Sequence, residues 1–581
     1  MHYPWWYVPV ATAPMLIALI ATLHVLVAHY AVGGGFFLAV ETSFAYRTGN
    51  QAYLSYLRRH AQFFILLTVV FGAITGVGIW WTIGLASPLA TQVLIQTFVF
   101  GWAMEWVFFV LEITSAFGFF YFWGRLPPAV HRAFGWIYAW AAWISLVLIT
   151  GITGFMLHPG RWPDLEYRSF WIAFFNPQFV PQVVARTGGA LLLSSLYVYL
   201  HAAWTLQHQA GLRELVARRS ARPALLGTAL LLLGGGLWAA FLPESARAVI
   251  PAAAALNIFM PLAVGISALV VVMVYLGPLK NPGWLSVGFA GTLWLLGLAG
   301  FSVGEFIREA IRKPYIIYNV VFGHQIFPEE VARMRQQGFL ESGLWTRAWM
   351  AAYYPQVFVS DRSSTVQVDA SPSAIASQEG IAPAAFSPTF SSSSASVAAP
   401  AGRTSLAGPE GRLSMVGPAA RIDEARLLQL PQADQVQIGR VLFMYHCNDC
   451  HAERDGYSAA GRLLQGRSKP RMVELVRHLH EHRFVMPPWS GTDEEAQVLA
   501  EYLATITPPR PAGMYPEGLS QHSIFRRPRL ANVQPPAPIK PSQNSTLTTQ
   551  RFAAQSFSAP IGSALPAADF GTSFELGDAA R

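Results

Sequence analysis

Long apolar stretches separated by short polar connections are the main pattern of this chain. Eight of them are long enough to cross a bilayer, and they lie near residues 9–44, 61–85, 91–123, 133–157, 181–207, 224–242, 251–276 and 283–306. Of the 581 residues, 53% are apolar and only 12% are charged, well below the charged share of soluble domains. We therefore predict an all-α fold, in which a polytopic transmembrane helix bundle over residues 1–313 precedes a small helical domain.

Basic residues gather in every second connection between these stretches. These connections follow the first, third, fifth and seventh stretch and hold Arg47, Arg58, Arg59, Arg125, Arg132, Arg213, Arg218, Arg219, Arg222 and Lys280. Because cytoplasmic loops carry the excess of Lys and Arg, the N-terminus and the chain after Arg312 are predicted to lie outside the cytoplasm. The net charge of +8 comes largely from helix ends, so a lipid bilayer is expected as a partner and nucleic acid is not.

The composition changes several times after the bundle. Residues 314–360 mix polar and aromatic side chains, and we expect them to form a small cap packed on the bundle. Residues 361–430 are rich in Ser, Ala and Pro, which predicts a flexible linker because such a segment buries little apolar area. Helical periodicity returns over 431–508, and the Pro- and Ser-rich residues 509–581 are expected to be a disordered tail.

The sequence Cys447-Asn-Asp-Cys450-His451 is the attachment motif of a c-type haem. Two thiols three residues apart can bond both vinyl groups of one porphyrin, and the adjacent imidazole of His451 then becomes the proximal iron ligand. A zinc site would need two more soft ligands, and no other cysteine exists in the chain. A redox pair of cysteines would have no use for the histidine. We predict a covalent haem c.

The order of motifs in this domain resembles a class I cytochrome c. A helix leads to the Cys447 motif, a loop with Met486 before two prolines follows, and the helix over 493–506 closes the domain. The resemblance implies that Met486 is the distal iron ligand and that His/Met ligation raises the reduction potential. The competing ligands lie in charged, helical surroundings and are interpreted as solvated surface; they are His446, His478, His480 and His482.

Two carboxylates lie inside the third apolar stretch. Glu105 and Glu112 are seven residues apart, so a helix places them on one stripe, roughly 10 Å apart along its axis. His24 in the first stretch lies at a depth similar to that of Glu105, judged from the prolines that open the two helices. Charged groups in a membrane are costly and often functional, which favours a metal or haem site. The alternative is a set of neutral, hydrogen-bonded side chains that only hold helices together.

The membrane region resembles subunit I of the cytochrome bd oxygen reductases over about residues 15–320. The similar stretches are TLHVLVAHYAVGGGFFLAVET (22–42), MEWVFFVLE (104–112), GFMLHP (154–159) and REAIRKPYIIYNVV (308–321). The resemblance implies that His24 ligates the oxygen-binding haem and that Glu105 is the acid on the same haem. It also implies that Glu112 lies near the haem pair and its proton supply.

The last of these stretches contains the family's Glu-x-x-Arg-x-Pro-aromatic motif. By resemblance, Glu309 ligates the high-spin b haem and Arg312 pairs with a haem propionate, while Glu305 is the rival ligand. The alternative is a ladder of ion pairs at a helix end, each worth only ~0.3–0.5 kcal/mol.

This chain departs from the family at the low-spin b haem. Where the family has a ligating histidine in the fifth span, the alignment places Arg186, which cannot bind iron, and Met260 is the remnant of the other ligand. The family's long quinol-binding loop is reduced here to residues 242–253. We therefore expect this haem and the quinol site to be absent. His201 and His208 lie at the wrong end of the fifth span to replace the ligand and are expected at the interface.

These features together predict a haem-dependent membrane terminal oxidase subunit that reduces O2 to water. Electrons would enter through the fused cytochrome c from a c-type donor and reach two membrane haems of b or d type. The resemblance implies a bacterial cell membrane, a second subunit, and a cytochrome c domain on the periplasmic side. Two alternatives remain: a quinol-oxidising membrane cytochrome b that reduces its own cytochrome c, and a non-enzymatic, membrane-anchored electron carrier.

Overall fold

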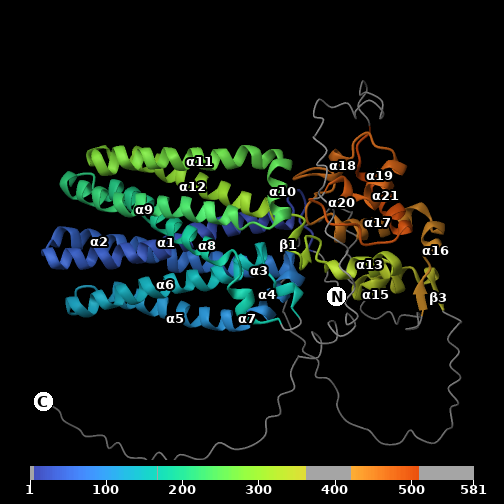
Figure 1. Cartoon of the computed structure of the whole chain (residues 1–581), viewed down its shortest axis with the longest axis horizontal. Coiled ribbons are helices and arrows are strands. Elements are labelled where there is room, and N and C mark those ends of the chain that lie inside the picture. Colours follow the sequence, from blue (N-terminus) through green and yellow to red (C-terminus); the bar gives the residue numbers. More distant parts are fainter. Residues whose placement is uncertain (1–5, 166–167, 361–419, 484, 510–581) are drawn as a thin grey trace, which may run out of the picture. The chain divides into compact units, whose positions relative to one another are not determined.

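The structure is a computed structural model that describes residues 6–165, 168–360, 420–483 and 485–509. Most of the predicted linker and nearly all of the predicted tail therefore lie outside the described residues. Figure 1 shows long helices that run side by side, followed in the chain by shorter helices and two small strand pairs.

Helices account for the whole membrane region. In chain order they are α1 (Ala13–Thr48), α2 (Gln51–Ile65), α3 (Gly72–Ala86), α4 (Pro88–Thr97), α5 (Val99–Tyr121), α6 (Pro128–Leu157), α7 (Phe170–Phe174), α8 (Phe179–Thr205), α9 (Ala210–Ala240), α10 (Glu244–Ala252), α11 (Ala254–Val274) and α12 (Val287–Ala310). A π-helical turn over Leu66–Phe71 joins α2 to α3, and a second one over Tyr275–Lys280 ends α11.

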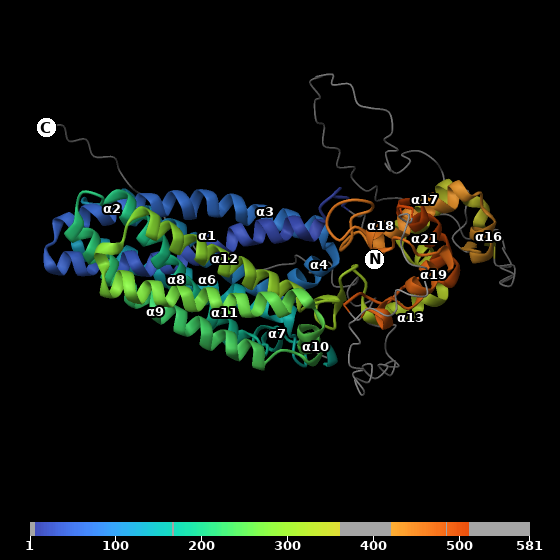
Figure 2. The ribbon, with the colours of Figure 1, turned by 90° about the horizontal axis from the view of Figure 1, so that it is seen from above.

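Eight of the described helical segments are long and apolar enough to cross a membrane, which confirms the predicted fold class. The second span begins at Gln51 and the sixth at Ala210, ten or more residues before the predicted starts. The first turns of α2 are polar, so a search for apolar stretches does not detect them. The start of α2 is set by two neighbouring residues. Gly49 ends α1 with a φ of 65°, and the Asn50 side chain caps α2 by accepting a hydrogen bond from Tyr53 N. The short connections near residues 49, 124, 208 and 283 share one end of the bundle, which we call the turn end (left in Figure 1; Figure 2 turns the same ribbon by 90°).

Helix α1 is the centre of the bundle and packs against α3, α6, α8 and α12. Three successive glycines allow this close approach. A Cβ on Gly33 would lie 2.0 Å from Ala190 O of α8, one on Gly34 would meet the Phe64 ring of α2 at 2.7 Å, and one on Gly35 would meet Tyr138 of α6 at 2.5 Å. The sequence VGGGFF therefore fixes three helix contacts at one level of the bundle.

The second domain is built from short helices and strands. They are β1 (Tyr315–Ile317), β2 (Val321–Phe322), α13 (Pro328–Gln337), α14 (Phe339–Ser342), α15 (Leu344–Tyr353), β3 (Phe358–Ser360), β4 (Ala420–Ile422), α16 (Glu424–Gln429), α17 (Gln432–His446), α18 (Ala460–Leu463), α19 (Lys469–Arg477), α20 (Leu479–His482) and α21 (Asp493–Ile506). Strands β1 and β2 pair antiparallel, as do β3 and β4.

The expected cap divides between the two domains. Its first part, including Ile317 and Val321, packs with apolar residues of α4 and α6. Its second part, including Phe339 and Met350, shares one hydrophobic core with Phe443 and Leu499 of the last helical domain. We expected the cap to pack on the bundle, and this second part packs on the last helical domain instead. Its α15 is amphipathic, and a pattern of that kind does not tell which partner covers the apolar face.

The last helical domain begins earlier than residue 431. Strand β4 starts at Ala420 and pairs with β3, with Val359 opposite Arg421. Between the two strands lie residues 361–419, which are outside the described part of the chain. Because β3 and β4 are only three residues long, their pairing across this separation left no signal in the local sequence.

Candidate functional site

The CxxCH motif, Cys447 to His451, follows directly after the end of helix α17. The helix ends at His446, and the amides of Cys450 and His451 both bond back to Cys447 O, at 3.0 and 2.9 Å. Neither cysteine forms a disulfide. Burial raises the pKa of the Cys447 thiol to about 12, which keeps it protonated and unlike the activated thiolate of a redox pair.

The ring of His451 is held by its Nδ1 atom. Nδ1 lies 2.7 Å from Ser458 O, so Nδ1 carries the proton and donates it to this carbonyl. This tautomer leaves Nε2 as the basic nitrogen, which is the arrangement that a ligating imidazole needs. The motif and its surroundings therefore fit a covalently attached haem with His451 as the proximal ligand.

The loop with Met486 is fixed through its backbone. Met486 N donates to Arg483 O at 2.8 Å, and His480 Nδ1 lies 2.8 Å from Met486 O. His480 was expected to be solvated surface, but it is half-buried and holds the loop. The sequence suggests that His480 holds this loop only through its position, six residues before Met486 and the two prolines that follow Met486.

A buried histidine of the preceding segment supports the same loop. His324 Nε2 lies 3.2 Å from Pro488 O, and burial lowers the pKa of His324 to about 4, so the ring is neutral and donates to that carbonyl. Its ring also lies 5.6 Å from the ring of His446. This residue was not among the predicted site residues, because a single histidine in a short turn has no recognisable pattern.

In the bundle, His24 of α1 is held against α3. Its Nδ1 lies 3.1 Å from Thr75 Oγ1. The Thr75 hydroxyl also lies 2.9 Å from Phe71 O and 3.1 Å from Gly72 O, both of which only accept hydrogen bonds. Since the single hydroxyl proton of Thr75 goes to a carbonyl, Nδ1 of His24 is the donor to Thr75 and Nε2 is left for a metal. This is the same arrangement as at His451.

Glu105 and Glu112 lie on α5, and α6 packs against both α5 and α1. Ser145 of α6 donates to Glu105 Oε1 at 3.3 Å. The described hydrogen bonds give His24 and Glu105 separate partners on different helices, so the two are not bonded to each other. A haem between them therefore stays a prediction.

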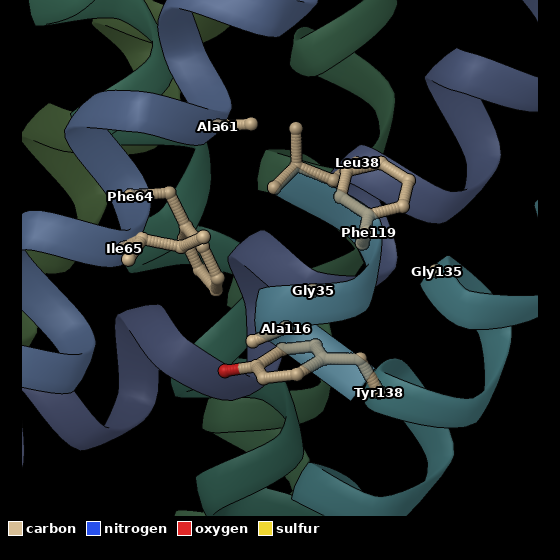
Figure 3. Close-up of a pocket in the computed structure, with 9 residues that line it drawn as sticks. All are labelled: Gly35, Leu38, Ala61, Phe64, Ile65, Ala116, Phe119, Gly135 and Tyr138. Atoms are coloured by element: carbon tan, nitrogen blue, oxygen red, sulfur yellow. The ribbon is translucent and has the colours of Figure 1, made fainter. Parts of the chain in front are cut away.

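A small cavity lies one turn beyond Glu112 (Figure 3). It measures about 10 Å³, no more than the space of one water, and it is lined by Gly35, Leu38, Ala61, Phe64, Ile65, Ala116, Phe119, Gly135 and Tyr138. The Tyr138 hydroxyl, on the side of Phe64 and Ile65 in Figure 3, donates to Ala31 O at 3.2 Å. Because nearly all of the lining is apolar, the cavity does not supply Glu112 with ordered water.

The end of α12 forms a ladder of ion pairs. Glu305 pairs with Arg308 at 2.9 Å, and Glu309 pairs with both Arg312 and Lys313, the latter at 3.7 Å. Glu309 is therefore engaged by two cations. Arg312 is 6% exposed and donates to Ile316 O at 2.9 Å, but its buried Nε has no hydrogen-bond partner among the described residues. A buried, unsatisfied guanidinium nitrogen fits a haem propionate at this position.

Lys313 connects this ladder to the CxxCH motif. Besides its ion pair with Glu309, its ammonium group interacts with the Cys450 thiol and with Asp449. One side chain is thus ion-paired with the candidate membrane ligand Glu309 and lies within electrostatic reach of an attachment cysteine.

Comparison with protein families gives two matches. Residues 13–255 match the family described as cytochrome bd terminal oxidase subunit I, and residues 434–503 match cytochrome c oxidase, cbb3-type, subunit III. The chain joins a cytochrome bd subunit I-like membrane domain to a C-terminal cytochrome c domain. Among solved structures, it is similar to the bd oxidase from Geobacillus thermodenitrificans, at 20% identity and a TM-score of 0.47, over 52% of this chain and 87% of that chain. No match is found among curated proteins.

The match to the bd family includes His24, Glu105 and Glu112 but ends before Met260, Glu309 and Arg312. The roles of all six residues stay predictions, because a family match does not test single residues. Together the two family matches support a haem-dependent membrane oxidoreductase with a role in electron transport.

Arg186, at the aligned position of the family's histidine ligand, lies near charged side chains of α12. Arg186 of α8 lies within electrostatic reach of Glu305, Arg308 and the buried His29 of α1. Met260 of α11 packs in a separate apolar cluster that includes Leu256 and Ile307. In the described chain, α9 and α11 are joined by the single short helix α10, Glu244–Ala252. His29 was not predicted as a site residue, although it lies only five residues after His24.

Proposed function

We propose that this protein reduces O2 to water with electrons that enter through its cytochrome c domain rather than from quinol. Electrons would pass from an external c-type donor to the site at Cys447, Cys450 and His451, then to the site near Glu309, and finally to the site at His24 and Glu105. Haem, when bound at these places, supplies reversible one-electron chemistry and a position for O2.

The observation that carries this proposal is the position of Lys313. Its ammonium group interacts with Glu309 of the membrane domain and with Cys450 of the cytochrome c domain. This position of Lys313 supports a short path for electrons between the two proposed haem sites. The positive charge of Lys313 would also stabilise the reduced form of a haem bound at either site, because each reduced haem carries one more negative charge.

The protein side chains have distinct parts in the proposed reaction. His451 and Met486 would hold the iron of haem c, and Thr75 would orient His24 so that Nε2 binds the oxygen-reactive haem. Arg312 would neutralise a propionate of the haem near Glu309. Glu112, seven residues from Glu105 on the same stripe of α5, would pass protons to the oxygen site.

We place the turn end on the cytoplasmic side and the cytochrome c domain on the periplasmic side of a bacterial cell membrane. The basic residues at the turn end support this orientation. We also propose a second subunit against α3 and α5, where large aromatic side chains such as Trp81 and Trp106 are 65% and 63% exposed.

The test combines a haem count with oxygen uptake. The purified protein should contain one haem c and two membrane haems by pyridine haemochrome analysis, and should consume O2 with a reduced c-type or artificial donor. Cys447→Ala and His24→Ala should abolish uptake, while His208→Ala, which changes an exposed histidine beyond the end of α8, should leave it unchanged.

The other outcomes identify the alternatives. Reduction of haem c by quinol without O2 would support a quinol-oxidising cytochrome b. A single haem of c type per chain, with no O2 uptake, would support an electron carrier.

A further inference from the structure

A column of polar side chains crosses the half of the bundle nearest the turn end and has no part in the site described above. Its members are Tyr30 and Glu41 of α1, Tyr53, Tyr56 and His60 of α2, His201 of α8 and Arg219 of α9. The residues Tyr53, Tyr56 and His60 follow each other at intervals of three and four, so α2 presents them on one face.

The column begins at an ion pair near the turn end. Arg219 pairs with both carboxylate oxygens of Glu41, whose side chain is 8% exposed while that of Arg219 is 28% exposed. The Tyr53 hydroxyl donates to Glu41 Oε2 at 2.8 Å. Solvent therefore reaches the Arg219 end of this ion pair, while Glu41 itself is buried.

Between Tyr53 and His60 the column consists of stacked rings without a direct hydrogen bond among the described residues. The rings of Tyr53 and Tyr56 lie 6.2 Å apart at 12°, and those of Tyr56 and His60 lie 5.9 Å apart at 28°. The buried Tyr56 hydroxyl has no hydrogen-bond partner among the described residues. Since buried hydroxyl groups are nearly always hydrogen-bonded, we expect ordered water beside it.

His60 is the branch point of the column. Its Nε2 lies 3.1 Å from the Tyr30 hydroxyl and its Nδ1 lies 3.1 Å from Nδ1 of His201. His60 and Tyr30 are fully buried. A neutral imidazole donates through one nitrogen and accepts through the other, so it can take a proton on one side and release one on the other.

Other roles fit these residues less well. A metal site would need a third ligand, and the described residues contain no group of three or more histidine, cysteine or acidic side chains placed to hold a metal ion. Purely structural packing does not require two sets of hydrogen-bonded titratable groups at this depth, where each polar group is costly.

We propose that this column carries protons from the turn end toward the oxygen site. The inference rests on the proposed function, in which each O2 takes up four electrons and four protons to give two waters. Tyr30, at the inner end of the column, lies six residues from His24 on α1, roughly 9 Å along the helix. The described hydrogen bonds form two sets, one ending at Tyr53 and one centred on His60, and ordered water at the Tyr56 hydroxyl would join them. Such a route through α1, α2 and α8 would supplement Glu112 of α5.

A matched pair of variants tests the column. Tyr30→Phe removes the hydroxyl that bonds His60 and keeps the ring. Tyr46→Phe makes the same change in another tyrosine of α1, whose hydroxyl lies 3.0 Å from Nδ1 of His131. This second chain of hydrogen bonds stops at His131, because Nε2 of His131 lies 2.9 Å from the backbone carbonyl of Phe119. His60→Gln is the second variant of the column.

Full-length variants should be compared for haem content, O2 uptake and the solvent isotope effect in D2O. We expect Tyr30→Phe and His60→Gln to bind haem normally and to slow O2 uptake about tenfold or more, with a larger isotope effect, as for the loss of a proton-transfer group. Tyr46→Phe should match the wild type.

Equal rates in all variants, or a loss of haem that accounts for the slower rates, would overturn the inference while leaving the oxidase proposal intact. A wild-type protein that contains its haems but consumes no O2 would overturn both.

Discussion

Nδ1 of His24 lies 3.1 Å from the hydroxyl oxygen of Thr75, on the neighbouring span. The Thr75 hydroxyl gives its proton to a carbonyl of its own helix, and Gly76 beside it leaves room for the imidazole, since a Cβ there would lie 3.2 Å from His24 Cε1. Two adjacent residues of α3 thus set the tautomer and the orientation of the candidate ligand. His451 is set in the same way by Ser458 O, although the two histidines lie in unrelated domains.

Thr75→Val should weaken haem binding at His24. Valine keeps the shape of threonine but cannot accept from Nδ1, and the loss of such a partner behind a ligand typically costs about 10–100-fold in affinity or activity. The absorption spectrum and haem content of the purified full-length protein would show the effect. Thr75→Ser keeps the hydroxyl and should restore the wild-type spectrum; a normal spectrum in Thr75→Val would show that Thr75 does not orient the ligand.

Lys313→Met should slow electron transfer from haem c to the membrane domain. The substitution keeps a long side chain between Glu309 and Cys450 but removes the charge, and we expect a decrease of about tenfold, equivalent to about 1.4 kcal/mol. Flash or stopped-flow spectroscopy would follow the oxidation of haem c after O2 is added. Lys469→Met is the control, because Lys469 pairs with Glu501 within the cytochrome c domain. A similar decrease in both variants would contradict the role of Lys313.

Local patterns in the sequence were enough to predict the eight spans and the small helical domain with its CxxCH motif. Each depends on contiguous residues: about twenty apolar positions for a span, or about five residues for the motif. The roles of His324 and Thr75 could not be predicted, because each becomes recognisable only when a partner from another segment is in place. His324 bonds Pro488 across 164 residues, and Thr75 bonds His24 across 51.

The alternative interpretations of the carboxylates show a second limit. The motif around Glu309 suits both a haem site and an ion-pair ladder, and the structure contains the ladder, with Glu309 bonded to Arg312. The row Tyr53, Tyr56 and His60 has the period of a helix face, but aromatic residues at this spacing are also ordinary membrane packing. Only the bonds from His60 to Tyr30 and His201 separate the two interpretations.

Glu424→Gln should change how the stability of the cytochrome c domain depends on pH. Burial, followed by the nearby Glu495, raises the pKa of Glu424 to about 9, against an ordinary value of 4.5. Between these two values the folded domain keeps a proton that the unfolded chain has lost, so stability falls as the pH rises through this range. Glutamine keeps an oxygen that can accept from the Thr492 hydroxyl, which lies 2.8 Å from Glu424 Oε2, and the variant should lose this pH dependence.

The thermal midpoint of the cytochrome c domain in the full chain, followed by its haem absorbance at about pH 6 and about pH 8.5, would measure this effect. Glu424→Gln should gain stability relative to the wild type at the higher pH. Glu501→Gln changes a carboxylate that pairs with Lys469 and should keep the wild-type slope. Parallel pH profiles for Glu424→Gln and the wild type would show that Glu424 is ionised in the folded domain.

Gly33→Ala should destabilise the membrane domain. The added Cβ would lie 2.0 Å from Ala190 O and 2.6 Å from its carbonyl carbon, and backbone atoms of a packed helix cannot move aside as a flexible side chain can. Overpacking of this kind costs about 1–3 kcal/mol or more, because α1 and α8 must separate. The thermal midpoint of the detergent-solubilised protein would measure the loss. Gly236→Ala in α9, where nothing lies within 4 Å of the added Cβ, should be neutral or slightly stabilising, and equal midpoints for the two variants would mean that α1 and α8 do not pack this closely.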